Sequence, residues 1–269
     1  MLQQTQAARV APAYVDFIRE FPSVGALAAA PRAAVLRAWG NLGYPRRAVA
    51  LSAAARMIVL DPGGRVPEDP AVLRSLPGFG PYTAAAVAAL GYGRPVAALD
   101  VNVRRVTART LLGVEPHRAP AAAVEAAAVR WLGSGTRARS GTRPGSRGPR
   151  PGDVLQALMD LGRAVCRPRP RCPECPLEAA CRFRASGAVP ERAPRRQPAY
   201  AGSLREVRGA VLRALRAASP RTIGGLAAAT GFPPERLAQA VGGLAADGVG
   251  VAGAAALAGR ERGRVALPG

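Results

Sequence analysis

The sequence contains no lysine and a single histidine, and its acidic residues are few. It has 17 Asp and Glu against 38 basic residues, all of them Arg, and a formal net charge of +21. The use of Arg in place of Lys is typical of GC-rich codon usage, but such an exchange leaves the charge unchanged and does not explain the excess over acids. That excess favours a nucleic acid or another anionic partner, the alternative being charge that serves solubility alone.

Long hydrophobic runs are also missing. No uninterrupted apolar stretch approaches the ~20 residues of a membrane-spanning helix, which excludes a transmembrane protein. Residues 1–5 lack the basic flank and apolar stretch of a secretory signal. Hydrophobic residues still make up 49% of the 269 residues, which excludes a disordered polycation. We therefore expect a cytoplasmic, bacterial and nucleoid-associated protein of two or three small domains, and a monomer.

The first hundred residues carry the spacing of short helices. Apolar residues at helical intervals predict a helix over Ala7–Phe21, and further helices follow over Arg32–Trp39 and Arg46–Val59. Pro22 and Pro31 separate these segments. Nothing here alternates with the period of a strand, and the abundance of Ala favours helix.

Two segments interrupt this pattern. Residues 133–152 hold five Arg, no acid and almost nothing apolar, which predicts a disordered basic loop. Residues 188–203 contain three prolines and several charges and predict a linker. The part after the linker is typical of a winged-helix domain, with a generic three-helix cap as the alternative. Its expected elements are helices over 204–217, 222–229 and 233–246, a turn at Gly231, and a small hairpin within 249–267.

All four cysteines fall within sixteen residues, at Cys166, Cys172, Cys175 and Cys181. In a cytosolic protein such clustering favours a metal site over disulfides. Structural zinc usually uses two separated Cys-x-x-Cys pairs or a mixture of Cys and His, and this chain has one such pair. Four thiols with uneven gaps suit a [4Fe–4S] cluster better, with zinc as the alternative. Several Arg surround the cysteines, so we expect a structural loop that presents cations to phosphate.

Residues 76–84 read Leu-Pro-Gly-Phe-Gly-Pro-Tyr-Thr-Ala. Gly78 and Gly80, on either side of Phe79, allow a tight turn between two helices, and the free amides at the start of the second helix suit a phosphate. Such a turn is a weak signal alone. It gains weight because an amphipathic helix follows it, and then the segment Leu-Asp-Val-Asn-Val-Arg-Arg at residues 99–105.

These motifs together resemble the helix-hairpin-helix DNA glycosylase superfamily, and within it the adenine DNA glycosylases of the MutY type. The resemblance covers residues 1–184 apart from the basic loop. It rests on Met-Leu-Gln-Gln-Thr-Gln at 1–6, Asn-Leu-Gly-Tyr at 41–44, the hairpin, the Asp100 segment, Met-Asp-Leu-Gly at 159–162, and the cysteines. An ordered set of this kind is very unusual by chance.

The resemblance implies an enzyme that flips adenine, mispaired with guanine or 8-oxoguanine, out of duplex DNA and hydrolyses its N-glycosidic bond. Asp100 would stabilise or trap the oxocarbenium-like sugar, although an aspartate at a helix start is also a common N-cap. Tyr82 and Asn102 match positions that contact the reacting nucleotide. The positions that enter the base stack or face the base opposite adenine are matched by Gln4, Thr5 and Tyr44.

The absence of lysine separates two branches of this superfamily. The endonuclease III branch carries a lysine at the position of Tyr82, whose amine forms a Schiff base and permits strand cleavage. We therefore expect monofunctional hydrolysis without a lyase step of that type. The alternatives are a thymine or other mismatch glycosylase of the superfamily, and an inactive iron–sulfur DNA-binding protein or regulator.

The sequence departs from the family pattern in three places. Family members carry a general-acid Glu two residues before the segment that here begins at Met1; we hypothesise an upstream start codon or, alternatively, a DNA-binding protein without activity. The gap between Cys166 and Cys172 is five residues where the family usually has six. The tail is too short and helical for the Nudix-like domain of many relatives, which leaves the choice between 8-oxoguanine and guanine open.

The predicted architecture is all-α. A six-helix lobe with the hairpin spans residues 1–98, and a cluster lobe spans 99–187. The linker at 188–203 leads to the winged-helix-like domain at 204–269. We expect the active cleft between the two lobes, with Tyr82 and Asp100 facing it.

Overall fold

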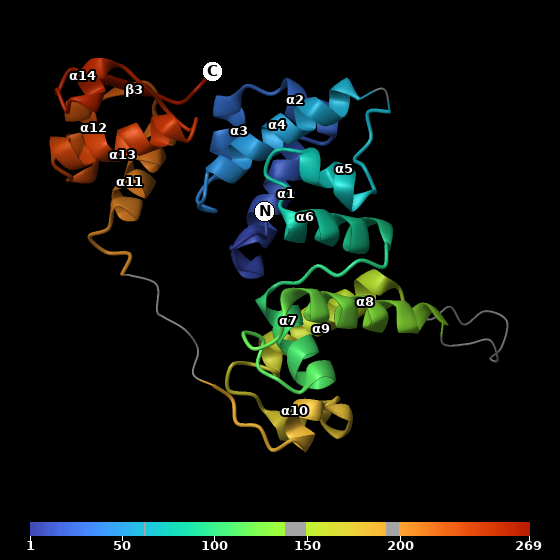
Figure 1. Ribbon diagram of the computed structural model, residues 1–269. Helices are drawn as coiled ribbons and strands as arrows, with labels where there is room; N and C mark the ends of the chain where they lie inside the picture. Colours follow the sequence, from blue (N-terminus) through green and yellow to red (C-terminus); the bar gives the residue numbers. More distant parts are fainter. Residues whose placement is uncertain (62, 138–148, 192–198) are drawn as a thin grey trace. The chain divides into compact units, whose positions relative to one another are not determined.

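The computed structural model of the chain describes residues 1–61, 63–137, 149–191 and 199–269, and this part is built almost entirely of helices (Figure 1). Its three strands have two or three residues each and lie near the C-terminus. The expectation of an all-α fold is therefore confirmed. No described helix combines the length and the apolar character that crossing a membrane requires.

The contacts between residues divide the chain into two compact units. The first unit consists of residues 1–65, 76–78 and 196–269, and the second of residues 66–75 and 79–195. The structure thus groups residues 79–98 with the cysteine-containing part, whereas the sequence assigned them to the first lobe. The predicted domain limits stay predictions.

Four helices separated by prolines open the first unit. Ser23 caps α2 by accepting a hydrogen bond from the Ala26 amide. The apolar faces of these helices bury Trp39, whose ring lies edge-on to Phe17 with the ring centroids 6.2 Å apart. The helices are α1 (Ala7–Glu20), α2 (Val24–Ala29), α3 (Arg32–Trp39) and α4 (Arg46–Leu60), which confirms the three helices predicted in this region to within one residue at each end.

The second unit carries the hairpin from Phe79 onward, the Asp100 segment and the cysteines. Helix α7 packs along α9, and the two run side by side in Figure 1. The π-helical turns η1 and η2 continue α6 and α7. The elements are α5 (Pro70–Ser75), α6 (Pro81–Ala86), η1 (Val87–Gly91), α7 (Val101–Thr107), η2 (Ala108–Leu112), α8 (Ala121–Arg137), α9 (Pro151–Ala164), the 3₁₀ turns η3 (Cys172–Glu174) and η4 (Glu178–Ala180), and α10 (Arg182–Ala185).

The basic loop is shorter than the sequence predicted. Helix α8 continues to Arg137 and α9 begins at Pro151, so the prediction of a loop over the whole of 133–152 was wrong at both ends. Gly152 is buried in α9, where a Cβ would lie 2.8 Å from the carbonyl oxygen of Ala89. The rest of the predicted loop, 138–148, lies outside the described residues, as does 192–198 of the predicted linker.

The C-terminal part of the first unit has the order of elements of a winged helix, which confirms that prediction. Thr222 caps α12 by accepting a hydrogen bond from the Gly225 amide, and Gly231, with φ +74°, ends it before α13. The strands form an antiparallel sheet in the order β1-β3-β2. The elements are α11 (Leu204–Ala217), β1 (Arg221–Thr222), α12 (Ile223–Thr230), α13 (Pro234–Ala246), β2 (Val251–Ala252), α14 (Ala254–Leu257) and β3 (Arg264–Ala266).

Gly162 sets how closely α7 and α9 approach each other. A Cβ at this position would lie 2.6 Å from the Cβ and 3.0 Å from the Cα of Asn102. We expect Gly162→Ala to destabilise the protein by about 1–3 kcal/mol, because overpacking forces the two helices apart. Gly133→Ala is the matched control, since a Cβ there meets nothing within 4 Å inside α8 and Ala is the better helix former. Thermal unfolding measures both, and equal stability of the two variants would contradict this packing.

Candidate active site and cysteine-lined pocket

Asp100 stands at the N-cap of α7. Its backbone is extended, with φ −76° and ψ 178°, and its Oδ1 accepts hydrogen bonds from the amides of Asn102 at 2.9 Å and Val103 at 2.6 Å. These amides are among those that a helix start leaves without an intrahelical partner. The capping role that the sequence offered as the alternative is therefore present in the structure.

The second oxygen of the same carboxylate is also engaged. Oδ2 of Asp100 accepts a hydrogen bond from the Nδ2 of Asn102 at 2.9 Å. Three N–H donors thus fix the plane of a half-buried carboxylate at the positive end of a helix. The structure brings together Asp100 and Asn102, two of the three residues predicted to be catalytic.

Tyr82, the third residue predicted to be catalytic, lies near this carboxylate. It stands in the first turn of α6 and is 38% exposed. Burial raises the pKa of its hydroxyl, and the negative charge of Asp100 raises it further. Because both effects act in the same direction, the hydroxyl keeps its proton at neutral pH and is available as a hydrogen-bond donor.

Arg105 connects this group to the cysteine-containing segment. Its Nη2 donates to the Oδ1 of Asn102 and to the carbonyl of Gly162, both at 2.8 Å, and its Nε donates to the carbonyl of Cys166 at 2.6 Å. Burial lowers the pKa of this guanidinium, which is the result of placing a charge among carbonyls away from water. The sequence did not single out Arg105; its spacing of three residues from Asn102 on α7 is the signal that points to it.

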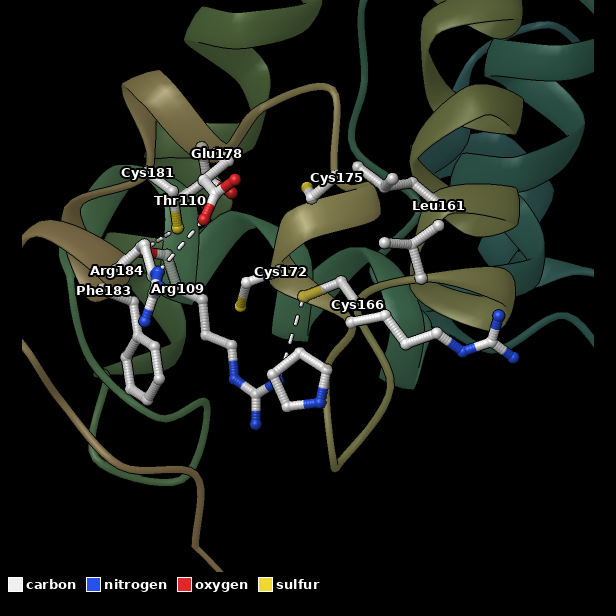
Figure 2. A pocket seen from close by; sticks show the side chains of 13 residues that line it. Arg109, Thr110, Leu161, Cys166, Cys172, Cys175, Glu178, Cys181, Phe183 and Arg184 are labelled. Atoms are coloured by element: carbon white, nitrogen blue, oxygen red, sulfur yellow. Dashed lines mark hydrogen bonds and ion pairs between the residues drawn. The ribbon is translucent and has the colours of Figure 1, made fainter.

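The four cysteines line one pocket, which is partly open to solvent (Figure 2). Cys166 follows the end of α9, and the other three lie in and beside the short turns that follow it. Figure 2 shows their sulfur atoms arranged around the pocket, together with the side chains of Arg109 and Phe183. Residues that the sequence grouped by spacing are thus grouped in space.

Four thiols are the kind of donor set that an iron–sulfur cluster or a zinc ion uses. Among the described residues, no three Cys, His, Asp or Glu side chains converge as ligands of one metal ion, for which zinc–sulfur distances of about 2.3 Å would be needed. An iron–sulfur cluster contains its own iron and inorganic sulfide and takes only thiolate ligands from the protein, which suits four thiols around a pocket. Burial raises the pKa of the Cys166 thiol, while a hydrogen bond and the positive charge from Arg109 favour the thiolate that a metal requires.

Arg109 is a buried cation between the pocket and the loop after α9. Its Nη1 lies 3.9 Å from the Sγ of Cys166 and donates to the carbonyl of Arg167 at 2.7 Å. Its Nη2 pairs with Glu115 at 2.7 Å, and the two side chains are 2% and 7% exposed. The guanidinium also lies 5.1 Å from the ring centroid of Phe183. The loop that bears Cys166 is therefore held by a buried, charge-neutral pair.

The hairpin glycines have different surroundings. Gly78 has φ +79°, and a Cβ there would lie 2.8 Å from the Cβ of Ala50, so this position requires glycine for two reasons. Gly80 is the N-cap of α6 and precedes Pro81, and a Cβ there would meet nothing within 4 Å. Phe79 is half-buried between them.

Gln4, Thr5 and Tyr44 lie together in the first unit. Gln4 is exposed, Tyr44 is 48% exposed, and the Oγ1 of Thr5 donates to the carbonyl of Leu42 at 3.1 Å. Arg47, which the sequence did not single out, donates a hydrogen bond to the Oγ1 of Thr5, and its guanidinium lies over the ring of Tyr44. The three residues predicted to face DNA therefore belong to one local structure.

Comparisons with known proteins agree with these motifs. The family model for the HhH-GPD superfamily of base excision DNA repair proteins matches residues 1–132. The adenine DNA glycosylase of Mycobacterium tuberculosis is 44% identical over 220 residues, which are 81% of this chain and 68% of that protein. The adenine DNA glycosylase of Mycolicibacterium smegmatis is 42% identical over 217 residues, 80% of this chain and 69% of that protein. Among solved structures, a thermostable thymine-DNA glycosylase matches with a TM-score of 0.56 and 28% identity, over 69% of this chain and 80% of that one.

The buried Arg109–Glu115 ion pair predicts that a single substitution lowers the free energy of unfolding strongly. We expect Glu115→Ala to lower the free energy of unfolding by about 3–5 kcal/mol, because it leaves a buried guanidinium without its counter-charge. Glu68→Ala is the matched control, since Glu68 pairs with Arg94 at 2.9 Å with both side chains at least half exposed. That exposed pair contributes about 1 kcal/mol at most. Denaturant unfolding of the two variants tests the difference, and a similar small loss in both would show that Arg109 does not depend on Glu115.

Proposed function

Because the chain belongs to the family of adenine DNA glycosylases, we propose that it removes adenine mispaired with guanine or 8-oxoguanine from duplex DNA, by hydrolysis of the N-glycosidic bond. The family makes the chain a DNA glycosylase of base excision repair and a hydrolase. What we propose beyond the family is that the excised base is adenine and that it is removed from a mismatch. The observation that carries the proposal is the grouping of Asp100, Asn102 and Tyr82 in the second unit.

Asp100 supplies the negative charge that the reaction needs. Cleavage of the N-glycosidic bond leaves positive charge on the sugar, and a carboxylate held in one orientation stabilises that charge without having to reorganise. The amides of α7 and the Nδ2 of Asn102 hold the carboxylate in place. Capping and catalysis are compatible, because Oδ1 receives both helix amides while Oδ2, with one N–H partner, keeps a further lone pair.

Tyr82 and the absence of lysine support a monofunctional reaction. The hydroxyl of Tyr82 is protonated at neutral pH and offers a hydrogen bond to the reacting nucleotide. The chain has no lysine to form a Schiff base with the sugar. Water is therefore the final acceptor of the sugar, and the strand stays intact.

The hairpin and the positive charge bind the duplex. Gly78, Phe79 and Gly80 form the turn before α6, and the first amides of this helix are suited to bind a phosphate of the DNA. A net charge of +21 strengthens binding to the DNA backbone generally and makes it sensitive to salt. Gln4, Thr5 and Tyr44 contribute the contacts to the base stack and to the base opposite adenine.

We propose that Cys166, Cys172, Cys175 and Cys181, which line one pocket, would hold a [4Fe–4S] cluster. When bound, the cluster would act as a structural cross-link for the loop after α9. Arg109 donates toward the sulfur of Cys166, and Arg105 binds the carbonyl of the same residue. This chain's own contribution is thus a set of cations that orient the cysteine loop and balance the charge of its thiolates.

Substitution of Asp100 separates its two roles. The single oxygen of Asn can still accept from the α7 amides, so we expect Asp100→Asn to keep the helix cap and DNA binding and to lose only the hydrogen bond from the Nδ2 of Asn102. Loss of the negative charge should lower the rate of adenine release by at least about 100-fold. Asp100→Ala, the companion variant, should lose the rate and in addition about 0.5–2 kcal/mol of stability.

The rates are measured under single-turnover conditions on duplexes with adenine opposite 8-oxoguanine, guanine or thymine, and with thymine opposite guanine. The chain as printed and the chain extended by any in-frame upstream residues are compared. Adenine release from the first two duplexes supports the proposal. Release of thymine in preference to adenine would identify a different mismatch glycosylase, and undiminished turnover by Asp100→Asn would refute the role of Asp100.

The cluster is tested by elemental analysis. Anaerobically purified protein should contain iron and acid-labile sulfide at about four atoms each per chain. Cys175→Ser should lose most of both, because it removes one of four ligands, while Ser186→Ala should keep them. A colourless protein that contains zinc in place of iron and sulfide would contradict the cluster.

A further inference from the structure

Two residues in the first unit have an unusual backbone conformation. Gln4 has φ +55° and Tyr44 has φ +47°, and they are the two non-glycine residues with positive φ in the described part of the chain. This conformation is unfavourable for residues with a side chain, and it persists only where the surrounding structure holds it in place. The two residues are 40 positions apart in the sequence, yet one side chain donates hydrogen bonds to residues next to both.

That side chain is Arg47, at the start of α4. Its Nη1 donates to the carbonyl of Met1 at 2.8 Å and to the carbonyl of Gln3. Its Nη2 donates to the Oγ1 of Thr5 at 2.8 Å and to the carbonyls of Leu42 at 3.3 Å and Gly43 at 3.1 Å. The partners of Arg47 thus flank Gln4 on both sides and precede Tyr44 directly.

Aromatic rings hold the guanidinium in place. It lies 5.1 Å from the ring centroid of Trp39 and 5.4 Å from that of Tyr44. Trp39 is 1% exposed, and its Nε1 donates to the carbonyl of Gly43 at 3.0 Å. The guanidinium therefore sits on a rigid base that belongs to the core, and burial lowers its pKa.

The exposed side chains near this guanidinium form a surface of their own. Leu2 is 63% exposed, Tyr44 is 48% exposed and Gln4 is exposed as well, while the backbone carbonyls beside them are turned inward to Arg47. The Nε2 of Gln3 donates to the carbonyl of Gly78 at 3.4 Å, which joins the same segment to the hairpin turn. Exposed apolar and amide side chains on a fixed backbone are suited to stacking on bases and to reading their edges.

We propose that Arg47 is a positioning residue for recognition of the base opposite adenine, because it fixes Gln4 and Tyr44 as one rigid reading surface. The proposal rests on the proposed function, and it adds a residue that touches no DNA itself. Arginine is required at this position. Its planar fork reaches five acceptors at once, whereas the three donors of a lysine ammonium diverge from one point and cannot serve both segments.

The test compares Arg47→Ala with Arg46→Ala. Arg46 carries the same charge one residue earlier, and it is exposed, with its Nε 3.6 Å from Asp247. Equilibrium binding is measured on duplexes that carry a non-hydrolysable adenine analogue opposite 8-oxoguanine or guanine, against a matched duplex. Arg47→Ala should lose roughly tenfold or more of the preference for the mismatched duplexes over the matched one. Arg46→Ala should weaken binding to all duplexes alike and keep the preference.

A second measurement does not depend on DNA. Hydrogen exchange of the backbone amides in residues 2–6 and 42–44 should be at least about tenfold faster in Arg47→Ala than in Arg46→Ala, since these segments lose the contact that orders them. Exchange in α11, which belongs to the same unit as Arg47, should be the same in both, which shows that this unit is folded in the variant. Arg47→Lys should restore the charge but neither the slow exchange nor the preference.

The outcomes distinguish this proposal from the proposed function. Retained preference in Arg47→Ala, or an equal loss in Arg46→Ala, would overturn the role of Arg47. Full recovery by Arg47→Lys would also overturn it, because charge alone would then suffice. If the unsubstituted protein shows no preference for mismatched duplexes, the proposed function and the recognition role fail together. Unchanged exchange in Arg47→Ala would refute the positioning of Gln4 and Tyr44 while leaving the proposed function intact.

Discussion

The carboxylate of Asp100 must satisfy the start of a helix and still present a charge at its surface, and the second unit is organised around that requirement. Two amides of α7 use one oxygen and the side chain of Asn102 uses the other. Asn102 is held in turn by Arg105, which binds the carbonyls of Gly162 and Cys166. The orientation of the carboxylate therefore depends on how α7 and α9 pack together.

The same packing links the proposed active site to the cysteine-lined pocket. α9 ends just before Cys166, so the helix that carries Gly162 against Asn102 also starts the cysteine loop. Arg105 and Arg109 reach this loop from α7 and the π-helical turn that continues it. The wider π-helical turn is a feature that often accompanies functional sites, because it shifts the side chains that follow it. Both cations bind backbone carbonyls of this loop, and Arg109 also lies 3.9 Å from the Sγ of Cys166.

The first unit also depends on an arginine that donates hydrogen bonds to backbone carbonyls. Its surface near Gln4 and Tyr44 requires two short segments in an unfavourable backbone conformation, and one buried guanidinium supplies hydrogen bonds to both. In each unit, an arginine that binds carbonyls orders the residues to which we assign contact with DNA. The large positive charge of the chain thus has two uses, since some Arg are exposed to solvent and a few are structural.

Local patterns in the sequence determined the helices, the hairpin glycines, the N-cap at Asp100 and the grouping of the cysteines, because each depends on residues close together in the chain. The ends of the basic loop were missed, since Gly, Ser and Thr near a helix terminus do not reveal where the helix stops. The roles of Arg47, Arg105 and Arg109 were decided by the tertiary structure alone. In the sequence they are three of 38 identical basic residues, and their partners lie up to 61 positions away. Their hydrogen bonds to backbone carbonyls distant in the sequence are what distinguishes them, and only the packed chain creates these contacts.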